Sequence, residues 1–433
     1  MKIEIHHRCS DFNSYRAARC KSLFNVESGC NFDLEAELPI DDNKWCLGLI
    51  VGPSGSGKTS IGKDIFGKDC FYAPDDWPKD KPIIDAISPK SKFDDITKAL
   101  AGVGLGSVPT WLRPFPVLSN GEKFRANLAR VVCEAPEKVV IDEFTSVVDR
   151  QIAQVGAFAF SKNWNRIQSE GVKKCVLLSC HYDIIDWLEP DWVYDIATGK
   201  YQGRGLWRRP KIKLEIYETN WKFWQVFQPH HYLKAGPMPA SRVYLGVING
   251  VPVVHLGVAP KPKGKKVETR GARFVVLPEW QGLGFGLRFR NYVAQLQLEG
   301  KGIMPGRNIT HISTTSHPGL CRAYRRDSKW QQITAPLYGQ RQATTKKSIK
   351  KRNAADSQKG FAKFGGHFRA VQTFRYIGEN LTADMVVTKF RGGRVRSAAE
   401  KNKAAQGKAK KKVVSDFPKQ TQAARQTKPN QNN

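Results

Sequence analysis

The chain has 433 residues, enough for two or three domains with separate hydrophobic cores. It contains no run of 18 or more apolar residues, and its start lacks the apolar stretch of a signal peptide, so the sequence predicts a cytoplasmic protein without a membrane span. Its nine cysteines form no CxxC pair, which argues against a disulfide scaffold or a zinc site.

The positive charge is concentrated in the second half of the chain. The formal net charge is +31, yet residues 1–205 hold 26 basic and 28 acidic side chains, whereas residues 206–433 hold 44 and 11. Such asymmetry predicts a polyanionic partner for the second half, most simply nucleic acid, with a solubility function as the alternative.

Composition divides the chain into three parts. Residues 1–205 carry ATPase motifs and predict an α/β domain. Residues 206–380 begin with short β-rich runs around Asn249-Gly250, a hairpin signal, and predict a second, mixed α/β domain. Residues 381–433 are rich in Lys, Ala, Gln and Asn and poor in apolar residues, so they predict a disordered basic tail.

The stretch CLGLIVGPSGSGKTSIGKDIF is an apolar strand, a G-x-x-x-x-G-K-T loop and a helix, the context in which this loop binds nucleotide phosphates. Lys58 would reach the β- and γ-phosphates of ATP, and the Thr59 hydroxyl would bind Mg²⁺. The backbone N–H groups of the loop and the helix N-terminus would hold the phosphates. The predicted ATP-binding residues are Gly52, Pro53, Ser54, Gly55, Ser56, Gly57, Lys58, Thr59 and Ser60.

Two further apolar strands end in polar residues suited to hydrolysis. KVVIDEF ends at Asp142, predicted to hold Mg²⁺, and at Glu143, predicted to polarise the attacking water. LLSCHYD ends at His181, which would sense the γ-phosphate.

The stretch VLSNGEKFRANLAR resembles the signature of the ATP-binding cassette (ABC) family. With the motifs above and SVVD at 146–149, the resemblance covers most of residues 20–200. It implies that Ser119 and Gly121 contact the γ-phosphate held by a second subunit, so that ATP binding produces a homodimer.

Some positions depart from the family pattern or are ambiguous. Asn120 and Glu122 replace the commoner glycine and glutamine of the signature, which suggests an altered rate of ATP hydrolysis. Asp75 and Asp76 lie where a Q-loop glutamine is expected. The aromatic residue that would stack on adenine is either Phe24 or Phe32, and either one could instead belong to the core.

A second glycine-rich loop, VVLPEWQGLGFG, has no lysine and reads as Q-x-x-G-x-G. With its preceding strand and following helix it resembles the acetyl-CoA pyrophosphate loop of GNAT-family N-acetyltransferases. The whole chain resembles ABC-type ATPases fused to a predicted GNAT domain over roughly residues 15–380. The resemblance implies acetyl-CoA binding by Phe274, Val275, Val276, Gln281, Gly282, Leu283, Gly284, Phe285 and Gly286.

Acetyl transfer needs a base for the amine proton and often an acid for the leaving thiolate. The resemblance places Tyr324 as that acid, with a packed core tyrosine as the alternative. His255 and Glu268 are candidate bases, although a histidine in a strand is more often a core residue.

The motifs together predict an ATP-hydrolysing, dimerising cassette joined to an acetyl-CoA-dependent N-acetyltransferase that acts at nucleic acid, on an amine of a base or of a bound protein. The alternative is a DNA-associated ABC ATPase whose GNAT fold is a non-catalytic scaffold. A transporter subunit is disfavoured, because only 61 positions separate Lys58 from Ser119 and the second half is basic.

Overall fold

The computed structural model forms two compact units. The first consists of Met1–Lys213 with Val276–Gly284, and the second of Leu214–Val275 with Phe285–Asn433. The predicted basic tail, 381–433, lies outside the described residues. The structure describes residues 1–8, 10, 14–24, 31–40, 45–168, 171–205, 207–232, 236–238, 240–264, 266–335 and 371–378.

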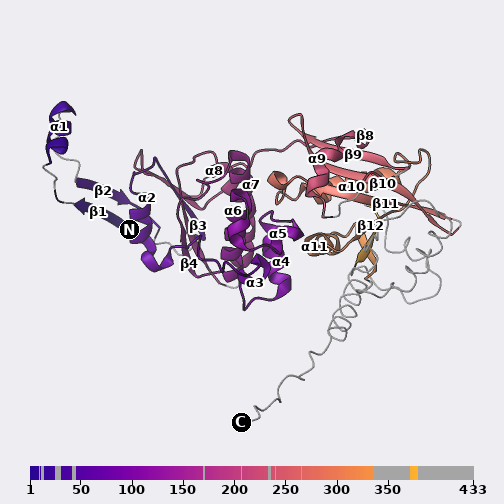
Figure 1. Cartoon of the computed structure of the whole chain (residues 1–433), viewed down its shortest axis with the longest axis horizontal. Coiled ribbons are helices and arrows are strands. Elements are labelled where there is room, and N and C mark those ends of the chain that lie inside the picture. Colours follow the sequence, from indigo (N-terminus) through magenta and orange to yellow (C-terminus); the bar gives the residue numbers. More distant parts are fainter. Residues whose placement is uncertain are drawn as a thin grey trace, which may run out of the picture. The chain divides into compact units, whose positions relative to one another are not determined.

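A five-stranded sheet is the centre of the first unit (Figure 1). Its order is β4-β5-β3-β6-β7; the first four strands are parallel and β7 is antiparallel to β6. The central strand, LGLIV, is buried along its whole length, as expected for a parallel strand covered on both faces. The α/β prediction is therefore confirmed for this unit. The strands are β3 (Leu47–Val51), β4 (Lys138–Ile141), β5 (Lys174–Ser179), β6 (Trp192–Asp195) and β7 (Lys200–Gln202).

Two hydrophobic layers cover this sheet. Because side chains alternate along a strand, Leu49 of β3 packs in the core with α4, α6 and α7, whereas Ile50 packs in the opposite core with α2 and the β1–β2 hairpin. The helices are α1 (Tyr15–Phe24), α2 (Lys58–Phe66), α3 (Ile83–Ala86), α4 (Phe93–Gly102), α5 (Val108–Trp111), α6 (Asn120–Glu134), α7 (Arg150–Ile167) and α8 (Ile185–Leu188). The hairpin is β1 (Lys2–Arg8) and β2 (Asn31–Glu37).

The second unit contains a seven-stranded mixed sheet in the order β13-β14-β12-β11-β10-β9-β8. The β11–β12 pair is parallel and is connected through α10, whereas β8–β9, β9–β10, β12–β14 and β13–β14 are antiparallel. The strands are β8 (Glu215–Thr219), β9 (Arg242–Ile248), β10 (Val251–Lys263), β11 (Lys266–Val276), β12 (His311–Thr315), β13 (Trp330–Thr334) and β14 (Gln372–Tyr376); the helices are α9 (Trp224–Phe227), α10 (Phe285–Leu298) and α11 (Pro318–Arg326).

The hairpin predicted at Asn249-Gly250 is confirmed. Both residues have positive φ, 50° and 80°, and Ile248 pairs with Val251 across the turn. This is the geometry of the type I′ turn that Asn-Gly favours, because its twist matches that of the flanking strands.

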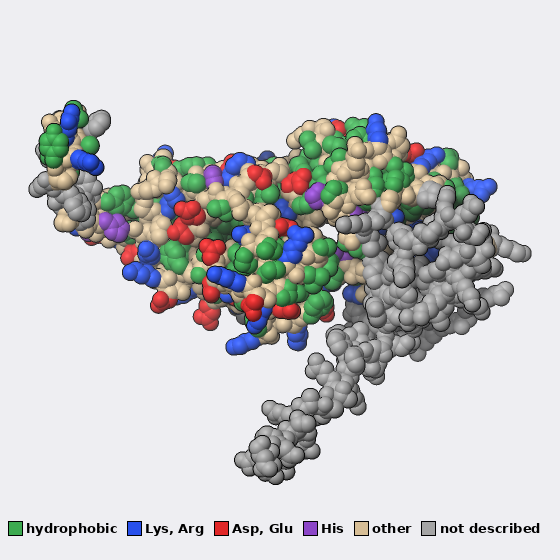
Figure 2. Space-filling view, in the orientation of Figure 1, with side chains coloured by type: hydrophobic (Ala, Val, Ile, Leu, Met, Phe, Trp, Pro, Cys, Tyr) green, Lys and Arg blue, Asp and Glu red, His purple; other side chains and the backbone are tan. Residues whose placement is uncertain are grey.

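The surface charge of the first unit follows its composition. In Figure 2, acidic and basic side chains are interspersed over the visible face of this unit, as expected from the nearly balanced charge of residues 1–205. Within the described ranges, no helix has the length and apolar character needed to cross a membrane.

Candidate nucleotide site

The first glycine-rich loop connects the buried strand β3 to α2. Gly55 and Gly57 have φ values of 76° and 94°, a region that glycine enters without steric cost. A Cβ on Gly57 would lie 2.8 Å from Leu34 Cδ2 and 3.0 Å from the Phe32 ring, so the loop also needs glycine here for close packing against β2. The predicted residues Gly52–Ser60 thus form a tight turn that opens onto a helix N-terminus, the arrangement that favours phosphate.

The loop is in direct contact with Asp142, the first of the two Walker B carboxylates, Asp142 and Glu143, which follow β4. Thr59 Oγ1 donates to Asp142 Oδ2 at 2.8 Å, which brings together the two predicted Mg²⁺ ligands from α2 and the end of β4. A hydroxyl at the start of α2 and a carboxylate just after β4 are oxygen donors of the kind that Mg²⁺ binds with phosphates. The residues therefore fit the cation that the motifs imply.

Lys58 and Glu143 are the neighbours in the chain of Thr59 and Asp142, respectively. Lys58 Nζ donates to the carbonyls of Gly52, at 2.9 Å, and Pro53, at 2.6 Å, so the ammonium lies over the loop. The N–H of Glu143 donates to Asp142 Oδ1 at 2.8 Å, and its carboxylate is exposed. Glu143 has a φ of 48°, unusual for a residue other than glycine.

The signature segment caps α6. Ser119 is the N-cap residue: its hydroxyl accepts from the N–H of Glu122, and the Glu122 carboxylate accepts from the Ser119 N–H at 3.0 Å. This is a capping box, which satisfies two N-terminal donors reciprocally. Glu122 also accepts from Thr110 Oγ1 at 2.9 Å. Gly121 packs against Ile152 of α7, where a Cβ would lie 2.8 Å from the isoleucine Cδ1.

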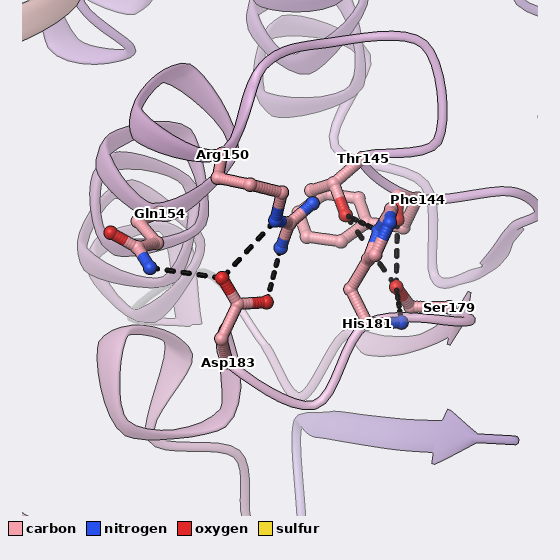
Figure 3. A network of polar contacts seen from close by, with 7 residues as sticks. All are labelled: Phe144, Thr145, Arg150, Gln154, Ser179, His181 and Asp183. Carbon is pink, nitrogen blue, oxygen red and sulfur yellow. Dashed lines mark hydrogen bonds and ion pairs between the residues drawn. The ribbon is translucent and has the colours of Figure 1, made fainter.

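His181 follows β5 within a network of polar contacts (Figure 3). Its Nδ1 contacts Thr145 Oγ1 at 3.1 Å, and its N–H donates to Ser179 Oγ at 3.1 Å. Asp183, two residues further on, binds the Arg150 guanidinium and accepts from Gln154 Nε2 at 2.9 Å. Burial, and then the Arg150 charge, lower the pKa of His181, while Asp183 opposes the shift. The imidazole is therefore neutral at neutral pH.

Of the two aromatic candidates for the adenine, Phe32 lies beside the phosphate loop. Its ring stacks on His7, with ring centroids 6.0 Å apart, and His7 Nε2 contacts Ser60 Oγ at 2.8 Å. Phe24 ends α1, and its side chain lies outside the described structure. Sequence reasoning missed His7, which comes from the distant strand β1.

The segment expected to carry a Q-loop glutamine is attached to the signature helix. Tyr72 Oη and Trp77 Nε1 both donate to Asn127 Oδ1 of α6, at 3.1 and 2.8 Å. Asp75 and Asp76 between them are exposed. Arg130 of the same helix donates to the Asp76 carbonyl, so Asn127 and Arg130 together anchor this segment, and the motifs singled out neither for this role.

The second glycine-rich loop, residues 276–284, belongs to the first unit. Gln281 Oε1 accepts from the N–H of Gly106 at 3.0 Å, and its Nε2 donates to the Val276 carbonyl at 2.8 Å. Arg125 of α6, 3% exposed, donates to the carbonyls of Gly104, at 2.8 Å, and Pro278.

Glycine is required where these segments meet. A Cβ on Gly104, whose φ is 88°, would lie 2.4 Å from the Gln281 carbonyl. The Gln281 side chain is a structural contact within the first unit. Gly284, with a φ of 82°, precedes α10, and Phe285 and Gly286 begin this helix.

The remaining candidates of the second unit are found around the β11–β12 pair. Tyr324 of α11 is fully buried, its hydroxyl donates to Ser313 Oγ at 3.0 Å, and burial raises its pKa to about 12. Arg290 of α10 donates to the same Ser313 Oγ at 2.5 Å, and its guanidinium lies over the rings of Phe274, 4.5 Å from the centroid, and Tyr324. Val275 is buried in β11.

Neither candidate base has the surroundings of a free general base. His255 packs against the rings of Trp221 and Trp224, and burial lowers its pKa to about 4. Burial acts to raise the pKa of Glu268, but bonds from Lys263 and Arg375, both at 2.9 Å, outweigh it and lower the pKa. Glu268 is therefore an ion-paired carboxylate.

No family model and no curated protein matches this chain. Among solved structures, it is similar to a bacterial ABC transporter cassette in a dimeric structure, at 12% identity and a TM-score of 0.31 over 40% of this chain and 93% of the other. A post-hydrolysis state of the same cassette with ADP and phosphate gives 13% identity and a TM-score of 0.30 over 41% and 90%. A candidate cobalt-transport ATP-binding protein is 19% identical, with a TM-score of 0.30 over 45% of this chain and 80% of the other.

Proposed function

We propose that the first unit is an ATPase of the ABC type that hydrolyses ATP with Mg²⁺. The observation that carries this proposal is the 2.8 Å contact between Thr59 and Asp142, which joins the phosphate loop to the Walker B strand. Bound Mg²⁺ would neutralise phosphate charge. Lys58 would leave the loop carbonyls for the phosphates, Glu143 would accept the proton of the attacking water, and His181 would contact the γ-phosphate.

The site calls for a second copy of the chain. Ser119 is exposed at the N-terminus of the 15-residue helix α6, where the helix dipole favours an anion. Its role as a phosphate contact requires a nucleotide from another subunit, so the proposed active form is an ATP-bound homodimer.

The second unit is proposed to be a GNAT-like N-acetyltransferase domain that takes acetyl-CoA. The β11–β12 ladder consists of the pairs Thr269–His311, Arg270–Ile312 and Gly271–Ser313, after which β11 continues to Val276 without pairing to β12. A parallel pair that parts before a glycine-rich turn and a helix suits the extended pantetheine arm and the pyrophosphate of acetyl-CoA. Tyr324 lies beside the point where the strands part, consistent with the proposed acid.

The proposed acceptor is an amine on a nucleic-acid base or on a nucleic-acid-bound protein, because the excess positive charge lies in residues 206–433. A second candidate function is a DNA-associated ATPase whose GNAT-like domain is a scaffold. The engagement of Gln281 with Gly106 favours it, since that amide already has partners on both sides.

Calorimetry with acetyl-CoA separates these two functions. Gly284→Ala and Gly284→Glu impose the same backbone strain at a φ of 82°, and only the glutamate adds negative charge. If the second unit is an acetyltransferase, the wild type and Gly284→Ala should bind acetyl-CoA, and Gly284→Glu should not. All three proteins should retain ATPase activity. Absence of binding by the wild type favours the scaffold, and equal binding by both variants contradicts the loop assignment.

A further inference from the structure

Thr145 holds a conformation that its side chain disfavours. It is a β-branched residue with a φ of 74°, it is 1% exposed, and it lies just after the Walker B carboxylates. A bulky residue at positive φ costs about 1–3 kcal/mol and persists only where neighbouring contacts impose it. Here the Phe144 N–H donates to the Leu178 carbonyl at 2.8 Å, and the Ser146 N–H donates to the Glu143 carbonyl at 3.0 Å. These bonds hold the strained residue on both sides.

The hydroxyl protons around His181 can be assigned from the contacts. Ser179 Oγ donates to the Phe144 carbonyl at 2.9 Å, so its proton is already used. The single proton of Thr145 then has two acceptors: Ser179 Oγ at 3.5 Å and His181 Nδ1 at 3.1 Å. The shorter contact assigns it to Nδ1. A neutral imidazole that accepts at Nδ1 carries its own proton on Nε2 and donates from there.

A second restraint acts on the segment that follows the histidine. Asp183 binds the Arg150 guanidinium with both carboxylate oxygens and also accepts from Gln154, one turn along α7 (Figure 3). Arg150 directly follows Asp149, the N-cap of α7. The position of His181 is therefore set from the Walker B strand by Thr145 and from α7 by the ion pair.

We propose that Thr145 is a positioning residue for ATP hydrolysis, because its hydroxyl holds His181 in the tautomer that donates from Nε2 to a terminal phosphate. The Arg150–Asp183 pair keeps the histidine segment in place for this bond. The proposal rests on the proposed ATPase function. This role explains why a threonine with a buried hydroxyl occupies a position where the backbone is strained, since the turn after the strand does not itself need a hydroxyl.

Two substitutions distinguish the effect of the Thr145 hydroxyl from the effect of the side chain's branched shape. Thr145→Val keeps the branched shape and removes the hydroxyl, and Thr145→Ser keeps the hydroxyl and removes the methyl group. The valine variant should lose tenfold or more of kcat with little change in KM for ATP or in ATP affinity by calorimetry. The serine variant keeps the hydroxyl and should stay within about threefold of the wild type, whereas loss of one donor to a developing charge costs about 10²–10³-fold in kcat.

Equal kcat values for the valine and serine variants would overturn the proposal. A wild type without ATPase activity would instead refute the proposed function, so the two failures are distinguishable. If Thr145→Val does not fold, ¹⁵N-histidine spectra of the wild type, assigned with His181→Gln, decide the question. They should show the neutral tautomer protonated at Nε2, and a ring protonated at Nδ1 would refute the assignment.

Discussion

The capping box of the signature helix gives a prediction that can be worked out in detail. The Glu122 carboxylate accepts three hydrogen bonds, from the Ser119 N–H at 3.0 Å, Ser119 Oγ at 3.0 Å and Thr110 Oγ1 at 2.9 Å. In Glu122→Ala the Ser119 N–H loses its carboxylate acceptor, which removes one half of the capping box, and the Thr110 hydroxyl, 2% exposed, loses its acceptor. The lost half of the box costs about 1 kcal/mol, and a buried polar group without a partner costs about 1–3 kcal/mol.

We therefore expect the alanine variant to lower the free energy of unfolding by roughly 3 kcal/mol, or the melting temperature by roughly 6–12 °C for a unit of this size. Glu122→Gln is the matched control. Its amide oxygen can accept from Ser119, and its NH₂ can donate to Thr110 Oγ1 in a bond of reversed direction, so both groups keep a partner while the charge is lost, at a cost of about 1 kcal/mol. Scanning calorimetry of the full chain measures both variants.

Because Glu122 is charged and glutamine is not, the difference in stability between the wild type and Glu122→Gln depends on pH. Burial acts to raise the pKa of Glu122, but the bonds from Ser119 and Thr110 outweigh it, so the folded pKa is lowered. The carboxylate therefore stabilises the fold above its unfolded pKa, and this stability is lost as the pH falls through the folded value. The difference between wild type and Glu122→Gln should vanish at acid pH. Equal destabilisation by alanine and glutamine would refute the capping-box account.

Two further predictions concern the partners. Ser119→Arg should abolish ATP hydrolysis yet leave ATP affinity largely unchanged in calorimetry, because Ser119 is proposed to serve the nucleotide of the second subunit; loss of binding in parallel with hydrolysis would contradict this role. Truncation after Asp384, which removes 13 basic and two acidic residues, should weaken nucleic-acid binding and reduce its salt dependence in a titration by electrophoretic shift. Equal binding at every salt concentration would assign the contact to the basic surface before the tail.

The phosphate loop was predictable from sequence because its chemistry is local: a buried strand, closely spaced glycines and a helix are consecutive. The carboxyl ends of parallel strands meet at one edge, so Asp142 and His181 could also be expected near it. The contact between Gln281 and Gly106 could not be predicted, because these residues lie 175 positions apart and no local pattern encodes such a contact. His7 and Asn127 escaped notice for the same reason. Likewise, β14 pairs between β12 and β13, although it is the last of the described strands along the chain.

The role of Glu122 shows the limit of comparing motifs alone. Against the family pattern it is a departure that suggests altered hydrolysis. In the structure it is the N3 residue of a capping box, a position that favours glutamate and glutamine alike. Tyr324 shows the converse: its place on the helix after β12 was expected, but its complete burial depends on packing against the nearby Trp330 and against Phe374, which lies 50 positions further along the chain.

The proposed active form is an ATP-dependent homodimer whose two nucleotide sites lie in one interface, each completed by Ser119 of the other subunit. Light scattering of Glu143→Gln with ATP and Mg²⁺ tests it most directly. The exposed Glu143 side chain can be replaced by its isosteric amide with little effect on folding, while the proposed base is removed. The account predicts a stable dimer with ATP and Mg²⁺ and a monomer without nucleotide. A variant that remains monomeric with bound ATP, or that hydrolyses ATP at the wild-type rate, would contradict it.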